Sequence, residues 1–289
     1  MSSMRDIKQR IENVSSVEQI IKAMDMVSST RLVKARRQLE GIRPMYKELK
    51  LIAEEVGTQE NAKRHIYYKE REVKNTLYII LTSDRGLCGS YNFNIMSKAL
   101  KHMNQGKNEK IIIVGSKGYE YFKKRDKNII HSVLDVADAK VYYGAESLAK
   151  MIIDSYLAAE VEEVYIAYTH FENVLTYVPV VERLLPIVSD GTENRDRDDK
   201  KYDPDLDSFI DNMIPLYLHM NLFRAYSESH TSEQASRMVN MDAAGKNASE
   251  IIEDLTHMYN RKRQAAITQE ISEIVGSANI LNKGGPDDS

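Results

Sequence analysis

The part of this chain with residues suited to chemistry is a glycine-bearing stretch, residues 83–92 (SDRGLCGSYN). It follows a β-branched run and opens a helical pattern, where glycines let backbone N–H groups approach an anion. Its spacing is neither Gly-x-Gly-x-x-Gly nor the Gly-Lys-Ser/Thr ending of a Walker loop. Residues 115–118 (GSKG) also join a strand pattern to a helix pattern, and such residues are common in turns. We interpret both stretches as structural turns, with a nucleotide site at residues 83–92 as the alternative.

The remaining reactive side chains form no catalytic or metal-binding pattern. The single cysteine, Cys88, has no histidine near it in the sequence, and a catalytic thiol needs a base. The seven histidines lack His-x-x-x-His and Glu-x-x-His spacing. Acid pairs such as Glu162-Glu163 are typical of solvated surface. We therefore predict no catalytic residue, no metal ligand and no bound cofactor.

Composition narrows the class of protein. The net charge of −3, from 40 basic and 43 acidic residues, gives no case for nucleic acid as a partner. One cysteine excludes a disulfide framework and fits a reducing cytoplasm. No apolar run approaches the roughly 20 residues needed to cross a bilayer. The chain is expected to be soluble or peripheral to a membrane.

Each end of the chain carries a seven-residue apolar repeat, which predicts a long helix that needs a coiled-coil neighbour. The first helix shows two interleaved series, interrupted in the second by Glu18 and Asp25. The series are Ile7, Val14, Ile21, Ser28, Ala35, Ile42, Leu49 and Val56, with Ile11, Leu32, Leu39, Tyr46 and Ala53. The last helix repeats through Met238, Gly245, Ile252 and Tyr259, with Met241, Ala248 and Leu255 between them. After Tyr259 the apolar stripe shifts to Ile267, Ile271, Ile274 and Ala278.

The middle of the chain alternates between strand and helix patterns. The expected strands are residues 76–83, 110–115, 128–133, 164–168 and 174–181, and the expected helices are residues 92–103, 116–124 and 144–159. Strands of this length separated by helices indicate a Rossmann-like α/β domain with a mostly parallel sheet. We divide the chain into a first helix (1–58), an α/β domain (72–188), a polar linker (189–205), a last helix (206–282) and a tail (283–289).

Three parts of the sequence carry a family resemblance. They are residues 19–27 (QIIKAMDMV), residues 83–92, and two C-terminal stretches, 232–239 (SEQASRMV) and 263–271 (RQAAITQEI). In this order, and over the whole length, they resemble the gamma subunit family, the central rotor shaft of F-type ATP synthases. The resemblance implies that the two terminal helices form an antiparallel coiled coil inside a ring of three alpha and three beta subunits.

The resemblance also implies partners and a location. The α/β domain is expected to contact the epsilon subunit and the ring of c subunits. One copy per complex, held peripherally at the cytoplasmic face of a bacterial cell membrane, would transmit ion-driven rotation during ATP synthesis or hydrolysis. Catalysis would take place on the alpha/beta ring, so this chain is expected to be non-catalytic.

Residues linked with coupling in that family match Met24, Arg263, Gln264, Thr268 and Glu270 here. Arg263 and Gln264 are expected to bind an acidic loop of a beta subunit, because the fork of arginine donors suits carboxylates. Asp25 stands where the family commonly has Glu, and residues 282–289 extend past the usual apolar tip.

Two other functions stay open at this point. One is a nucleotide-dependent enzyme built on the α/β domain, with the helices as a dimerisation arm. The other is a coiled-coil scaffold for different partners.

Overall fold

The structure, a computed structural model, describes residues 3–103, 108–135, 141–188, 202 and 204–283, and the side chains of these as far as residue 277. The predicted tail beyond residue 283, and all but residues 202, 204 and 205 of the predicted linker, lie outside this range. The described elements are α1 (Met4–Gly57), η1 (Ala62–Arg64), β1 (Asn75–Leu81), α2 (Tyr91–Met103), β2 (Asn108–Val114), α3 (Ser116–Lys123), β3 (Ile129–Val133), α4 (Val141–Leu157), β4 (Glu163–Phe171), β5 (Tyr177–Leu185) and α5 (Leu206–Lys283).

The apolar repeat of α1 is the buried seam of that helix. Every position of both series, from Ile7 to Val56, is buried or half-buried, and most neighbouring positions are exposed. Glu18 and Asp25, which interrupt the second series, are half-buried as well. The helix continues through Pro44. In α5 the predicted series through Tyr259 is likewise buried or half-buried.

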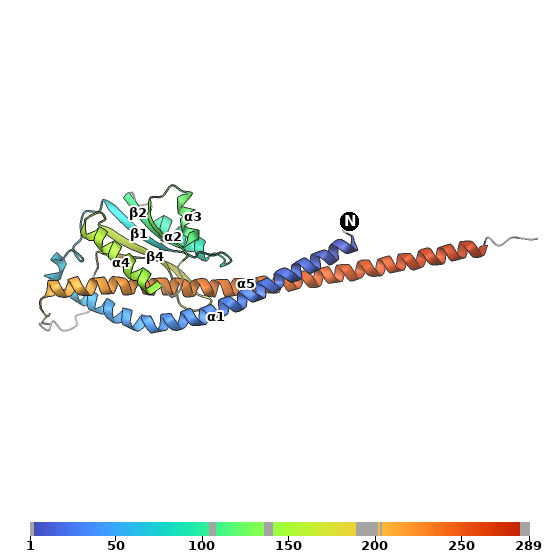
Figure 1. The fold of residues 1–289 in the computed structure, drawn as a ribbon, viewed down its shortest axis with the longest axis horizontal. Helices are drawn as coiled ribbons and strands as arrows, with labels where there is room; N and C mark the ends of the chain where they lie inside the picture. Colours follow the sequence, from blue (N-terminus) through green and yellow to red (C-terminus); the bar gives the residue numbers. More distant parts are fainter. Residues whose placement is uncertain (1–2, 104–107, 136–140, 189–201, 203, 284–289) are drawn as a thin grey trace, which may run out of the picture. The chain divides into compact units, whose positions relative to one another are not determined.

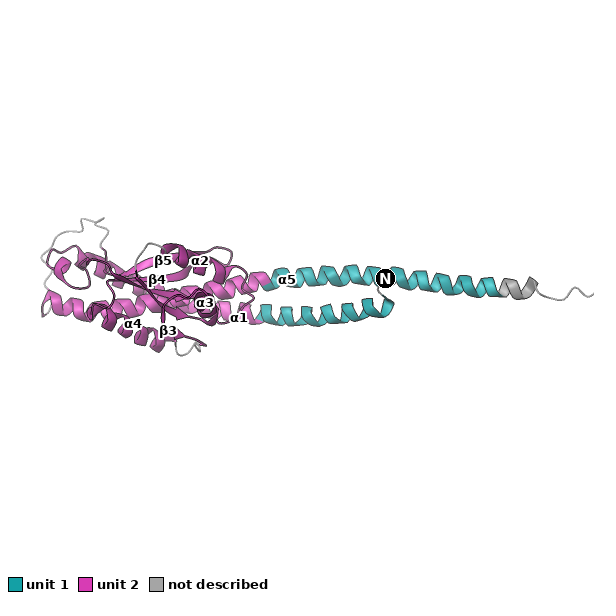
Figure 2. Cartoon of the chain, turned by 90° about the horizontal axis from the view of Figure 1, so that it is seen from above, with its two compact units in different colours: residues 1–26, 241–289 teal, residues 27–240 magenta. Residues whose placement is uncertain are grey.

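The chain divides into two compact units, residues 1–26 with 241–289 and residues 27–240 (Figure 2). In the first unit α1 and α5 pair antiparallel. Asp6 interacts electrostatically with Lys262, the Ser249 hydroxyl donates a hydrogen bond to Glu18, and Ile21 lies beside Gly245. The Ser249 hydrogen bond, followed by that of Lys22, lowers the pKa of Glu18 below its usual value. Glu18, which interrupts the apolar series of α1, thus forms a hydrogen bond across the seam to α5.

The second unit contains a five-stranded sheet in the order β3-β2-β1-β4-β5. Figure 1 labels three of these strands, β2, β1 and β4. Strands β3, β2, β1 and β4 are parallel, and β5 runs antiparallel to β4. The predicted fold class, a Rossmann-like domain between two long helices that pair as an antiparallel coiled coil, is confirmed. Helices follow β1, β2 and β3, as expected for right-handed crossovers between parallel strands.

Alternate residues of the central strand β1 enter two separate cores, because successive side chains point to opposite faces of a strand. Tyr78 and Ile80 pack with residues of α2 and α3. Leu77, Ile79 and Leu81 pack in a larger core that includes residues of α4, α5 and the C-terminal half of α1. Parts of both long helices, α1 from Ile42 to Val56 and α5 from Ile210 to Ala225, therefore belong to this core.

Two local predictions differ from the structure. Strand β5 begins at Tyr177 rather than at residue 174, because Asn173 forms a turn in which its side-chain oxygen accepts the N–H groups of Leu175 and Thr176. The connector between the predicted first helix (1–58) and the predicted α/β domain (72–188) was assigned to neither, yet its Tyr67 and Tyr68 are buried in the larger core. The Tyr68 hydroxyl donates to the carbonyl of Ala53 over 2.9 Å.

Candidate functional site

The glycine-bearing turn at residues 83–92 is occupied by hydrogen bonds from the chain itself. The Asn92 side chain accepts from the Ser83 N–H and donates to the Ser83 hydroxyl, at 2.9 and 2.7 Å. From α5, the Ser236 hydroxyl donates to the Cys88 carbonyl over 2.7 Å, and the Arg237 guanidinium donates to the Gly86 carbonyl over 3.2 Å. This geometry fits the interpretation of the segment as a structural turn.

The second glycine-bearing stretch packs directly against the first. Gly115 has a φ of 101°, and a Cβ there would lie 2.2 Å from the Thr82 carbonyl oxygen. The Gly118 N–H donates to the Thr82 hydroxyl over 3.0 Å. Asp84 accepts hydrogen bonds from both the N–H and the hydroxyl of Ser116 at 2.8 Å. The glycines therefore allow close packing between two turns.

Cys88 is buried beneath the first turn. Burial raises the pKa of its thiol above the usual value, although the Ser83 hydroxyl acts in the opposite direction. Its described hydrogen-bonding neighbours are Ser83, Asn92 and the Arg85 carbonyl, none of which is a general base, and the nearby Arg237 lowers its pKa less than burial raises it. Within the described residues, no three His, Cys, Asp or Glu side chains gather closely enough to hold a metal ion.

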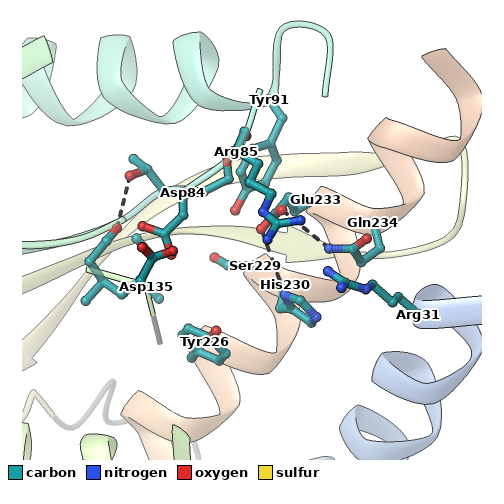
Figure 3. A pocket seen from close by; sticks show the side chains of 14 residues that line it. Arg31, Asp84, Arg85, Tyr91, Asp135, Tyr226, Ser229, His230, Glu233 and Gln234 are labelled. Atoms are coloured by element: carbon teal, nitrogen blue, oxygen red, sulfur yellow. Dashed lines mark hydrogen bonds and ion pairs between the residues drawn. The ribbon is translucent and has the colours of Figure 1, made fainter. Parts of the chain in front are cut away.

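A cavity of about 290 Å³ lies where β1 and β2 end, between the first turn and α5 (Figure 3). Several of its polar side chains already have partners: Glu233 bonds Arg237 at 2.7 Å, and Gln234 donates to Glu233 over 3.3 Å. The lining mixes both charges. It consists of Arg31, Leu81, Thr82, Ser83, Asp84, Arg85, Tyr91, Val114, Asp135, Tyr226, Ser229, His230, Glu233 and Gln234. Carboxylates beside guanidinium groups do not define a phosphate site.

The predicted coupling residues of α5 lie on one exposed surface. Arg263, Gln264, Thr268 and Glu270 are all exposed, and the Thr268 hydroxyl donates to the Gln264 carbonyl over 2.9 Å. Successive residues of an α-helix lie about 100° apart, so these four fall within roughly 160° of arc. The same arc carries the exposed apolar side chains Ile267, Ile271, Ile274 and Val275. The rest of the circumference carries Ala265, Ala266, Gln269, Ser272 and Glu273.

The exposed stripe is separate from the coiled-coil seam. The half-buried positions of α5 continue past Tyr259 at Lys262 and Ala266, which keeps the spacing of the seam. Ile267 is 48% exposed and Ile274 is 67% exposed. The apolar stripe beyond Tyr259 is therefore a second surface and not a displaced part of the first.

Met24, the fifth predicted coupling residue, lies elsewhere in the same unit. It is half-buried in α1, three residues beyond Ile21, which contacts Gly245. At a rise of about 1.5 Å per residue, this level of the coiled coil is about 30 Å from Arg263. The structure thus brings four of the predicted residues together and places Met24 apart from them.

A buried polar cluster, which sequence reasoning missed, joins α5 to the sheet. Arg224 of α5 is 4% exposed and donates to the Tyr168 hydroxyl at 2.8 Å and to Glu182 at 3.1 Å. Its guanidinium also lies 4.2 Å from the ring centroid of Tyr46 on α1. Burial alone lowers the pKa of Arg224, but the facing tyrosines and carboxylates raise it above the usual value. The guanidinium is thus a permanently charged centre between three elements.

Glu228, one helical turn further along α5, carries the matching negative charge. It is 2% exposed and accepts a hydrogen bond from Arg43 of α1 at 3.3 Å. His170 of β4 contacts its other oxygen, and Arg224 lies 3.6 Å away. We call the seven residues Arg43, Tyr46, Tyr168, His170, Glu182, Arg224 and Glu228 the helix–sheet joint.

The polar contact continues along α5 beyond the joint. Ser229 accepts from the Thr169 N–H at 3.0 Å, and Ser232 donates to the Thr169 carbonyl at 3.3 Å. The buried polar side chains of this part of α5 are His219, Asn221, Arg224, Ser227, Glu228, Ser229, Thr231, Ser232, Gln234, Ser236 and Arg237. A polar run in a helix normally indicates a solvated face, so only the Arg-Glu spacing of four at residues 224 and 228 hinted at pairing.

Two long helices that pair antiparallel, a Rossmann-like domain between them in the sequence and an exposed stripe on α5 define a coiled-coil protein with an inserted α/β domain. None of the described helices has a stretch apolar and long enough to cross a membrane.

The comparisons with known proteins agree with this class. The sequence matches the ATP synthase family over residues 3–281. The ATP synthase gamma chain of Desulforamulus reducens is 39% identical over 283 residues, which cover 97% of this chain and 100% of that relative. The gamma chain of Alkaliphilus metalliredigens is 38% identical, over 96% of this chain and 98% of its own length. In the cryo-EM structure of the Euglena gracilis mitochondrial ATP synthase, one chain has the same fold, with a TM-score of 0.69 at 18% identity, over 99% of this chain and 98% of that chain.

This chain therefore belongs to the ATP synthase gamma chain family, the family of the rotary central stalk. Membership favours the shaft over the nucleotide-dependent enzyme with a dimerisation arm.

Proposed function

We propose that this chain transmits rotation from an ion-driven membrane ring to a catalytic alpha/beta ring, and that it carries out no catalytic step itself. Family membership supports this role. The internal use of both glycine-bearing turns and the burial of Cys88 support a non-catalytic chain, because the features that suggested chemistry have structural partners. Rotation of the shaft would drive ATP synthesis, and hydrolysis would drive rotation in reverse.

The observation that carries the proposal is the one-sided surface of α5 between Arg263 and Val275. One half of the helix presents apolar and hydrogen-bonding side chains, and the other half is small or polar. A shaft that looked the same from every side would bind three equivalent beta subunits equally. Such a contact would shift no equilibrium, since a ligand changes a population only through differential affinity. An asymmetric helix gives each beta subunit a different surface at each rotor angle.

Within this surface we assign the contact with a beta subunit to Arg263, Gln264, Thr268 and Glu270. Arg263 and Gln264 are exposed donors and suit an acidic loop, because guanidinium and carboxylate pair in a fork geometry. Met24 would make a separate contact at a different level of the shaft. Its thioether is flexible and tolerates a changing partner surface.

The α/β domain would receive the rotation from the membrane ring. We assign to it the epsilon subunit and the c ring as partners, with one copy of the chain per complex. Attachment would then be peripheral, at the cytoplasmic face of a bacterial membrane, through these partners.

Co-purification from native membranes tests this function. The expected result is a complex that contains alpha and beta subunits together with this chain and hydrolyses ATP. Saturable micromolar binding of ATP or NAD to the isolated chain, lost on substitution within residues 84–92, would instead establish the nucleotide-dependent enzyme. Recovery with unrelated partners and no ATPase activity would establish the coiled-coil scaffold.

A further inference from the structure

The residues of α5 that contact β4 and β5 are polar, whereas the buried residues on either side of them along the helix are mostly apolar. Before them, α5 buries Ile214, Leu218 and Leu222, and after them, Met241, Ala248 and Leu255. Between these stretches the helix–sheet joint places a guanidinium and a carboxylate, 5% and 2% exposed, in the interior. Buried polar side chains run from His219 to Arg237 of α5, and the two charges of the joint lie within this run, where the helix passes β4 and β5.

Stability alone gives no reason for these buried charges. Removing two charges from water costs free energy, and well-packed apolar residues of similar volume usually stabilise a fold as well or better than a buried ion pair. A polar cluster adds a dependence on geometry, which fixes the relative orientation of the elements that it joins. Apolar burial is non-directional and survives a small slide or rotation, whereas hydrogen bonds weaken steeply as their angles change.

The joint connects elements that a turning shaft must hold together. Arg224 bonds Tyr168 on β4 and Glu182 on β5, while Glu228 bonds Arg43 on α1. Arg43 also donates to the Phe171 carbonyl at the end of β4. Both long helices are thereby fixed to the same two strands by charge-assisted bonds, which are stronger than neutral ones.

We propose that the helix–sheet joint carries torque between the α/β domain and the two shaft helices. This inference rests on the proposed rotary function and adds the route by which the domain turns the shaft. Arg224 and Glu228 are positioning residues: they act by preventing α5 from rotating or sliding against β4 and β5.

The test compares apolar repacking with the native joint in the assembled complex. In the double variant Arg224→Met with Glu228→Leu, the groups left behind stay partnered or reach solvent, since Arg43 and His170 are each 38% exposed. The control Lys50→Met with Glu54→Leu removes a pair with the same spacing from α1 whose side chains are 45% and 33% exposed. A probe attached through Lys98→Cys, at an exposed site on α2, reports the orientation of the α/β domain. Labelling is selective for this site because the native Cys88 is buried.

Angular variance of the probe is recorded while the complex, held through its catalytic ring, pauses for ATP. We expect the Arg224/Glu228 variant to keep the wild-type unfolding midpoint and to show roughly twofold larger variance, because directional bonds are lost while burial is kept. The Lys50/Glu54 control should match the wild type in both measurements. Wild-type variance in the Arg224/Glu228 variant would overturn the proposal.

A milder variant covers the case in which the double variant fails to assemble. Tyr168→Phe removes the hydroxyl shared by Arg224 and Glu182 and keeps the ring. It should give a smaller increase in variance, and no increase would likewise overturn the proposal. If the wild-type complex itself does not rotate, the proposed rotary function is refuted. If the wild type rotates and both variants show its angular variance, only the role of the helix–sheet joint is refuted.

Discussion

Arg43 and Glu228 are 185 residues apart in the sequence, yet Nε of Arg43 lies 3.3 Å from Oε1 of Glu228. The first belongs to α1 and the second to α5, and Glu228 also faces Arg224 and His170. The carboxylate is 2% exposed, so its charge is balanced by protein groups rather than by water. This pairing links the two long helices, α1 and α5, where both pack beside the sheet.

Breaking the pair from one side should be costly. Glu228→Leu leaves the buried Arg224 with one carboxylate fewer, and we expect a loss of about 3–5 kcal/mol in the free energy of unfolding. Adding Arg224→Met should restore the wild-type free energy of unfolding, because no uncompensated charge then remains in the interior. Urea unfolding of the full-length chain measures both. Equal losses in the single and double variants would show that the charges are not coupled.

Replacing a glycine by alanine should change the stability in opposite directions at two positions, according to the space around each. Gly115→Ala places a Cβ 2.2 Å from the Thr82 carbonyl at a φ of 101°, so we expect at least about 2 kcal/mol of destabilisation. Gly41→Ala on α1 meets nothing within 4 Å and should stabilise by about 1 kcal/mol through helix propensity. Thermal unfolding of both variants provides the check, and the same sign for both would contradict the packing described for Gly115.

The exposed surface of α5 should matter for coupling and little for folding. Arg263→Ala with Gln264→Ala removes two exposed donors, so the free energy of unfolding should stay within about 0.5 kcal/mol of the wild-type value. Ion pumping per ATP hydrolysed, measured in reconstituted vesicles, should fall. Gln269→Ala with Glu273→Ala is the matched control, since these residues bond each other at 3.0 Å outside that arc. Equal losses in both variants would contradict the assigned contact.

Alkaline pH should weaken the domain through its buried tyrosines. Burial raises the pKa of both Tyr168 and Tyr217 to about 12, from 10.0. Above pH 10 the unfolded chain releases these protons while the folded chain keeps them, so unfolding becomes easier as pH rises toward 12. Each tyrosine should contribute on the order of 2 kcal/mol to this loss. Tyr217→Phe should flatten the pH dependence measured by urea unfolding, and an unchanged slope would rule out its burial as the cause.

The sequence predicted those features that repeat or that depend on strand hydrophobicity. The seven-residue series from Ile7 to Val56 identified the seam of α1, since one buried stripe per helix suffices to define it. The β-branched runs identified the parallel strands. The start of β5 at Tyr177 was missed, because the side-chain turn of Asn173 competes with an alternating pattern.

The helix–sheet joint lay outside sequence reasoning for a physical reason. Arg224 and Glu228 look like a solvated ion pair on a helix, and the groups that justify their burial come from α1, β4 and β5. Only the tertiary fold brings those groups together. Similarly, the resemblance picked out Arg263, Gln264, Thr268 and Glu270, but their position on one exposed arc of α5 was not predicted. The separation of that arc from the seam follows from the half-burial of Lys262 and Ala266.

Direct observation of rotation tests the central claim. A complex of this chain with alpha and beta subunits is held through the catalytic ring, and a probe is attached through Lys98→Cys on α2. The rotor account predicts that the probe turns in one direction while ATP is hydrolysed and stops when hydrolysis is blocked. A stationary probe on a complex that hydrolyses ATP at its full rate would contradict it.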